Sequence, residues 1–117
     1  ILVSYYGWNN GPRRKWNSMD SIDELKNLRD EVRKVTIEII RLCGERFTLA
    51  RKIGETKIRK GLPIEDLQVE ENLKQEILGK CDSLGIESEF GLRMLDLLFE
   101  ESKRVQKSLV LQGKGDK

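Results

Sequence analysis

The residues with the most informative chemistry are charged side chains that interrupt an apolar helical seam. Arg46 occupies a heptad position that is otherwise filled by Leu, Ile or Val. Lys57 follows eleven residues later, which is about three helical turns and places it on the same face. A cation on a buried seam must be paired or must bind a ligand. The two side chains therefore predict either an internal ion pair or a site for an anion.

Polar residues also interrupt the apolar faces of the two segments that follow. Asp66 and Glu70 extend the stripe of the second segment, and Ser102 and Gln106 form an i, i+4 pair within the seam of the third. Cations, acids and neutral donors on inward faces suit a pocket for a small, doubly anionic, hydroxylated ligand. A buried salt-bridge network between the cations and these acids would explain the same set. It is the weaker explanation, because apolar residues usually hold a fold as well.

Arg29 has a different orientation from the other cations of the first segment. It lies seventeen residues before Arg46, which leaves it roughly 100° away around a helix. Arg29 therefore cannot easily serve the same pocket from its own chain, although it could serve the pocket of a partner across a dimer. Other charges, among them Lys74 and Lys103, fall on outward positions and are predicted to form a solvated face.

Three helices are predicted to position these residues, so the expected fold class is all-α. Spacings of three and four residues predict a long first helix over 21–60, ended by Gly61-Leu62-Pro63. A second helix is predicted from 64–66 to about 83, and a third after Ile86 with Glu87 or Ser88 as N-cap. We find no strand pattern from residue 20 onward.

The length of the first helix predicts a dimer. Roughly forty residues form a rod of about 60 Å. A compact domain of this size has a radius of gyration of only about 13 Å. The roughly fifty residues that follow cannot cover an apolar stripe of that length. We therefore expect an intertwined homodimer of three-helix protomers.

Composition divides the chain into an N-terminal appendage, 1–18, a helical domain, 19–111, and a flexible C-terminal tail, 112–117. Three of the 22 basic residues and none of the 20 acidic residues lie in the appendage, so the remainder has a net charge of −1. A nucleic-acid partner is not expected, because such proteins carry a basic stripe on the folded part. No stretch approaches the ~18 apolar residues of a membrane span.

The chain contains no histidine, the commonest general base and zinc ligand. Its two cysteines, Cys43 and Cys81, match no metal-ligand spacing and are predicted to be reduced thiols among apolar residues. The first residues lack the charged region of a signal peptide. We therefore expect a cytoplasmic protein that uses no metal and no cofactor.

From Leu28 to about Leu111 the chain resembles the all-helical class of chorismate mutases. The resemblance implies a three-helix protomer, with two long first helices spanning a dimer that holds two active sites. It also implies conversion of chorismate to prephenate in aromatic amino-acid biosynthesis, with no cofactor. The segments that carry it are Leu28-Arg29-Asp30, Gly44-Glu45-Arg46 followed by Leu49-Ala50, Ile53-Gly54-Glu55-Thr56-Lys57, Gly61-Leu62-Pro63-Ile64-Glu65-Asp66 with Glu70, and Glu100-Glu101-Ser102 with Gln106.

The resemblance assigns roles to the cations and to one amide. Arg29 looks like the arginine that holds a substrate carboxylate in the neighbouring subunit's site, and Arg46 like the one that holds the other carboxylate in its own. Lys57 looks like the lysine that bonds a carboxylate and the ether oxygen. Gln106 resembles the side chain that donates to the ether oxygen. These four residues are therefore the expected catalytic group.

The resemblance places the remaining polar residues around the ring of the substrate. Asp66 and Glu70 look like the acids around the ring hydroxyl, and Ser102 like a contact of the ring carboxylate. One position departs from the pattern: many relatives have an arginine directly before the acid that corresponds to Glu70, and this chain has Val69. Whatever that arginine contributes must be missing here or be supplied by another residue.

Two other functions remain open. An isochorismate pyruvate-lyase on the same scaffold also works by a pericyclic step, and the products would distinguish it. A non-catalytic helical dimerisation module predicts that Arg46 and Lys57 pair with Asp66 and Glu70 in a closed core. An open polar pocket would argue against that module.

Overall fold

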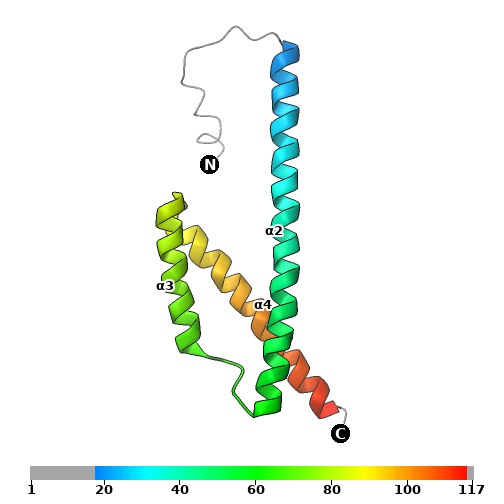
Figure 1. Ribbon diagram of the computed structural model, residues 1–117, viewed down its shortest axis with the longest axis vertical. Coiled ribbons are helices and arrows are strands. Elements are labelled where there is room, and N and C mark those ends of the chain that lie inside the picture. Colours follow the sequence, from blue (N-terminus) through cyan, green and yellow to red (C-terminus); the bar gives the residue numbers. More distant parts are fainter. Residues whose placement is uncertain (1–17, 116–117) are drawn as a thin grey trace. The chain divides into compact units, whose positions relative to one another are not determined.

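Three helices make up the part of the chain that the computed structural model describes, residues 18–115 (Figure 1). They are α2 (Ser18–Lys60), α3 (Leu67–Leu84) and α4 (Ser88–Gly115), and these residues contain no strand. The predicted all-α class is confirmed. The predicted appendage, except for Ser18, lies outside the described residues. The helix α4 continues past Gln112, where we expect the C-terminal tail to begin.

The helix ends follow from residues that the sequence places there. Asp66 is the N-cap of α3, and its carboxylate accepts a hydrogen bond from the Val69 N–H at 3.2 Å. Gly85 ends α3 with a φ of 68°, and Gly61 follows α2 with a φ of 66°. Glycine adopts this left-handed conformation without the steric cost of a Cβ. The predicted helix stops are therefore confirmed, while the second helix begins just after Asp66.

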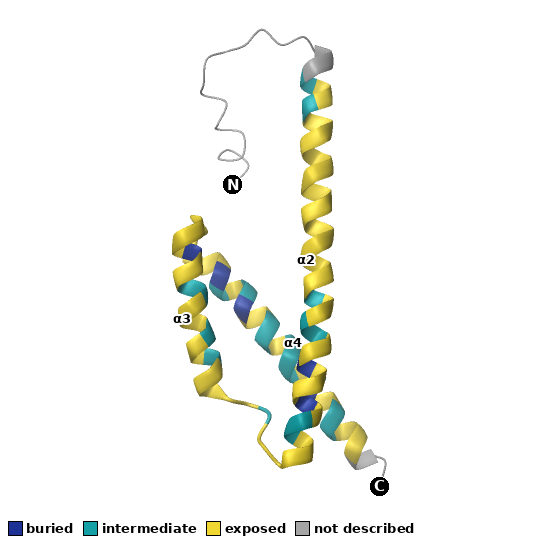
Figure 2. Cartoon of the chain, viewed as in Figure 1, coloured by how far each residue is buried: buried dark blue, intermediate teal, exposed yellow. Residues whose placement is uncertain are grey.

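The chain divides into two compact units, Ile1–Ile40 and Arg41–Lys117. The described part of the first unit is the beginning of α2. Its seam side chains are solvated there: Leu28 is 43% exposed, Val32 48% and Val35 61% (Figure 2). A continuous apolar stripe of this kind normally packs against another element. Nothing among the described residues of this unit covers it.

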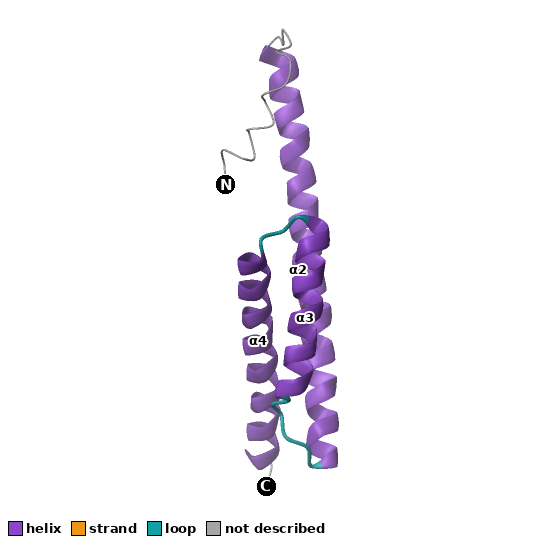
Figure 3. Ribbon diagram, turned by 90° about the vertical axis from the view of Figure 1, so that its left-hand side faces the viewer, coloured by secondary structure: helices purple, strands orange, loops and turns teal. Residues whose placement is uncertain are grey.

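In the second unit, α4 packs against α3 and crosses the later part of α2, as Figure 1 shows, and Figure 3 gives the same helices from the side. The buried apolar core is small and consists of Ala50, Cys81 and Leu95, and Gln106 is buried with them. Two glycines allow the close approach. A Cβ at Gly91 of α4 would collide with the Cys81 sulfur, and one at Gly54 of α2 would lie 2.9 Å from Gln106 Cγ.

No helix within residues 18–115 is long and apolar enough to cross a bilayer.

Candidate functional site

Arg46 is held against α4 by neutral oxygens. Its Nη1 donates to the Leu98 carbonyl at 3.1 Å and also to the Ser102 hydroxyl. The side chain is half-buried, so its charge is partly removed from water. Arg46 and Ser102, which the sequence places on separate helical seams, are therefore in direct contact.

Lys57 makes the second polar connection between α2 and α4. Its ammonium donates to the Ile64 carbonyl and, at 3.4 Å, to Gln106 Oε1. Gln106 is only 6% exposed, and it can lie this close because Gly54, one turn before Lys57, has no side chain. The helix crossing thus holds a half-buried cation beside a buried amide.

Neither Arg46 nor Lys57 forms an ion pair with a carboxylate in the described part of the chain. The predicted network between these cations and Asp66 or Glu70 is therefore not formed there. A half-buried cation with only neutral partners keeps most of its attraction for an anion, because carbonyl and hydroxyl oxygens carry no net charge. The arrangement suits binding of an anion.

Glu70 is engaged by Lys103 of α4 at 3.2 Å, and the same ammonium bonds Glu65 at 2.8 Å. The hydrogen bond from Lys103 lowers the pKa of Glu65. The bonds to Glu65 and then to Glu70 raise the pKa of Lys103. The prediction of a solvated Lys103 was wrong, since its side chain is only 28% exposed. Its spacing was the available signal, because it stands three residues before Gln106 and shares that face.

Asp66 takes no part in these contacts, and Arg29 belongs to the other unit of the chain. The Asp66 carboxylate is exposed and caps α3, whereas Glu70, one turn further on, is the α3 acid that pairs with Lys103 of α4. Arg29 belongs to the Ile1–Ile40 unit and is exposed. There it lines a shallow hollow of about 390 Å³ with Lys26, Asn27, Asp30 and Arg33.

The residues of the second unit that make the contacts described above are called the polar cluster: Arg46, Lys57, Glu70, Ser102, Lys103 and Gln106.

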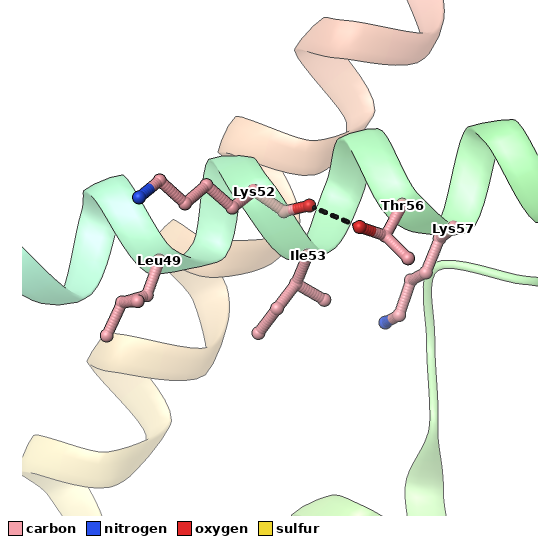
Figure 4. A pocket seen from close by; sticks show the side chains of 5 residues that line it. All are labelled: Leu49, Lys52, Ile53, Thr56 and Lys57. Carbon is pink, nitrogen blue, oxygen red and sulfur yellow. Dashed lines mark hydrogen bonds between the residues drawn. The ribbon is translucent and has the colours of Figure 1, made fainter.

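An open apolar surface borders the polar cluster at Lys57. A hollow of about 250 Å³ is lined by Leu49, Lys52, Ile53, Thr56 and Lys57, all from α2. Figure 4 shows Leu49, Ile53 and Lys57 pointing to the same side, with Lys52 extending along the helix and the Thr56 hydroxyl bonded to the Lys52 carbonyl at 3.0 Å. Leu49 is 56% and Ile53 50% exposed. The apolar seam therefore remains uncovered beside a cation of the site.

Comparison with known proteins gives a consistent match. The family model of chorismate mutase type II matches residues 28–107. A chorismate mutase of Methanocaldococcus jannaschii is 28% identical over 86 residues, which cover 74% of this chain and 87% of that protein.

Two bifunctional chorismate mutase/prephenate dehydratases also match. The protein of Buchnera aphidicola subsp. Schizaphis graminum is 32% identical over 94 residues, 79% of this chain and 24% of that protein. The Aquifex aeolicus protein is 42% identical over 57 residues, 49% of this chain and 16% of that protein. The chain therefore corresponds to a small part of these longer proteins. Since the matched range includes the whole polar cluster and most of the sequence, the chain belongs to the chorismate mutase type II family.

Proposed function

We propose that this chain is an isomerase that converts chorismate to prephenate. The observation that carries the proposal is the pair of half-buried cations, Arg46 and Lys57, whose partners within residues 18–115 are neutral oxygens, among them those of Ser102 and Gln106. Chorismate is a dicarboxylate with an ether oxygen and a ring hydroxyl. Family membership and the chemistry of the cluster point to the same ligand.

The reaction needs binding and electrostatics more than proton transfer. One C–O bond breaks while one C–C bond forms within a single molecule, so no general base is obligatory. The absence of histidine from the sequence is therefore no obstacle. The enzyme has to hold a flexible dianion in a compact, chair-like geometry. It also has to stabilise the negative charge that grows on the ether oxygen.

Arg46 and Ser102 would bind a carboxylate of the substrate. The planar guanidinium matches the two oxygens of a carboxylate, which gives both affinity and orientation. Ser102 already contacts Arg46, so its hydroxyl lies within reach of the same anion. We therefore expect Arg46 and Ser102 to bind one of the two substrate carboxylates together.

Lys57 and Gln106 would converge on the ether oxygen. Because Gln106 Oε1 accepts from Lys57, the other end of the amide is an NH₂ donor. A cation and an amide donor held at one point stabilise an oxygen that becomes negative in the transition state. A rate gain of about 10⁶ corresponds to about 8 kcal/mol. A few charge-assisted hydrogen bonds at about 1.5–3 kcal/mol each approach that scale.

Glu70 would accept the ring hydroxyl of the substrate, with Asp66 near it at the start of α3. Its carboxylate has two oxygens, and only Oε2 is bonded to Lys103. The structure supports Glu70 more directly than Asp66, because Asp66 is engaged in capping the helix.

We further propose that the enzyme is a homodimer in which Arg29 binds the second carboxylate in the partner's site. The support is the uncovered seam of α2, in which Val32 is 48%, Leu49 56% and Ile53 50% exposed. Burying such surface contributes about 25 cal/mol per Å². A cytoplasmic location suits the free thiols Cys43 and Cys81, which a reducing compartment preserves.

The test is to incubate the purified protein with chorismate and, separately, with isochorismate, and to identify the products by chromatography and mass spectrometry. We expect prephenate from chorismate. Release of pyruvate from isochorismate, without prephenate, would favour the lyase. A folded protein that converts neither compound would contradict both enzymatic functions and favour a dimerisation module.

A further inference from the structure

Lys103 makes a connection that differs from the ordinary surface ion pairs of this chain. Pairs such as Asp30–Arg33 join residues one helical turn apart, with side chains 49% and 62% exposed. Lys103 instead joins α4 to the start of α3, 38 residues away at Glu65. The side chains of Lys103 and Glu70 are 28% and 23% exposed. Lys103 therefore links separate elements, and its pair with Glu70 is less exposed than the surface pairs within one helix.

The position of Lys103 ties this contact to the polar cluster. It follows Ser102, which bonds Arg46, and precedes by one turn Gln106, which bonds Lys57. One stretch of α4 thus carries a partner for both cations and for the acid Glu70. Val69, next to Glu70, is 59% exposed and brings no charge to this place.

We propose that Lys103 is a positioning residue that fixes the Glu70 carboxylate for the ring hydroxyl of the substrate. The inference rests on the proposed function. Lys103 holds Glu70 Oε2 at 3.2 Å, which leaves Oε1 to accept a hydrogen bond from the ring hydroxyl. Its bond to Glu65 Oε1 at 2.8 Å keeps the flexible ammonium in place. Glu70 contacts the substrate, and Lys103 acts through Glu70.

This role has a kinetic signature that a purely structural role lacks. The ring hydroxyl is present in the substrate and in the transition state alike, so a poorly placed Glu70 weakens both complexes. Such a loss raises KM more than it lowers kcat. A merely destabilised fold would instead reduce the active fraction, which lowers the apparent kcat and leaves KM unchanged.

The experiment measures kcat and KM for chorismate with Lys103→Met, Lys103→Gln and Lys103→Arg, with Lys107→Met as the control. Lys107 is exposed, stands one turn further along α4 and has the same charge. We expect Lys103→Met and Lys103→Gln to lower kcat/KM roughly tenfold, mainly through KM, because contacting groups of this kind are coupled. Lys103→Arg should restore most of the value, and Lys107→Met should match the wild type.

The decisive comparison repeats Lys103→Met in a Glu70→Gln background. If Lys103 acts through Glu70, the second substitution changes kcat/KM by less than about twofold there. An equal loss in both backgrounds, an unchanged kcat/KM, or a loss confined to kcat overturns the inference. If the wild-type protein has no mutase activity, the proposed function is overturned together with this inference. If the wild type is active and one of these outcomes is found, only the role of Lys103 is overturned. Thermal unfolding of each variant verifies that folded enzymes are compared.

Discussion

Each half of α4 contains a nearly fully buried side chain, but the two side chains differ in chemistry. In the first half, Leu95 is 4% exposed and Gly91 packs against Cys81, which is 5% exposed. In the second half, Gln106 is 6% exposed, and its partner across the helix crossing is the cation Lys57. Apolar burial stabilises the fold, whereas polar burial costs free energy unless every group is bonded. We therefore expect the first half to serve mainly stability and the second to serve mainly the proposed reaction.

Among the changes that separate the two halves of α4, the largest effect is expected from Lys57→Ala on α2, which removes the cationic partner of Gln106 in the second half. Loss of a cation at the ether oxygen should lower kcat by about 10²–10³, the range found when one transition-state donor is removed. The fold should survive with a modest fall in the midpoint of thermal unfolding, because the substitution removes the hydrogen bond from Lys57 to the buried Gln106 oxygen. Lys60→Ala, on the exposed end of the same helix, is the control. A variant of Lys57 that keeps full kcat would remove the distinction between the halves.

Gly91→Ala tests the first half of α4, where we expect a loss of stability without a loss of kcat. A Cβ at this position collides with the Cys81 sulfur, and overpacking of this kind costs typically about 1–3 kcal/mol. The free energy of unfolding, measured with urea, should fall by that amount, while kcat per folded molecule stays unchanged. Gly79→Ala on α3 is the matched control, since nothing lies within 4 Å of its Cβ, and it should stabilise the helix by up to about 1 kcal/mol. The comparison is contradicted if Gly91→Ala lowers kcat with unaltered stability.

Gly54→Ala should affect both properties, because Gly54 sits at the helix crossing. Its Cβ would lie 2.9 Å from Gln106 Cγ and 3.0 Å from Leu109 Cδ1. The displaced Gln106 should lower kcat roughly tenfold, since small misplacements of catalytic groups are costly. The gain in helix propensity, about 1 kcal/mol, should offset much of the packing cost. Gly44→Ala on the same helix, with open space at its Cβ, should leave kcat unchanged, and equal kinetics for the two variants would refute the close-approach role.

The smallest effect concerns the dependence of stability on pH at Glu65. The Lys103 hydrogen bond lowers the pKa of Glu65 from its ordinary value of 4.5. The carboxylate therefore contributes stability above that value, and this contribution disappears as the pH falls through the lowered pKa. The raised pKa of Lys103 places the corresponding loss on the alkaline side, as the pH rises through that pKa.

Denaturant titrations of wild type and Glu65→Gln across the acid range measure this contribution. The difference in unfolding free energy should be small, because Glu65 is exposed and solvent screens the pair. It should vanish in acid and stay constant near neutral pH. A difference that grows as the pH falls would have the wrong sign for a lowered pKa.

Much of the fold follows from local sequence rules. The three- and four-residue spacings predicted the long α2, and Gly61 and Gly85 end helices at the left-handed positions that glycine favours. Arg46 and Lys57 were predicted to share a face of α2, and both reach α4. The period of a helix is local, so one sequence suffices for these statements.

Contacts between helices were less predictable. The spacing within α4 could have placed Lys103 on the face of Gln106, but whether it reaches Glu65 and Glu70 depends on the angle at which α4 passes α3, which that spacing does not determine. The same holds for the partner of Arg46: an ion pair with Asp66 or Glu70 was one alternative, and the structure brings Ser102 to Arg46. Asp66 was expected on the inward stripe of its helix, whereas its carboxylate is exposed and caps α3.

The most direct test of a dianion site shared by two subunits is a mixed dimer of Arg29→Ala and Arg46→Ala protomers. Each variant alone should be nearly inactive, because every site then lacks one carboxylate partner. A heterodimer isolated through two different affinity tags should regain about half of the wild-type kcat per dimer, since it contains one intact and one doubly altered site. A dimer of the two variants with no recovered activity would contradict a site that takes Arg29 from one subunit and Arg46 from the other.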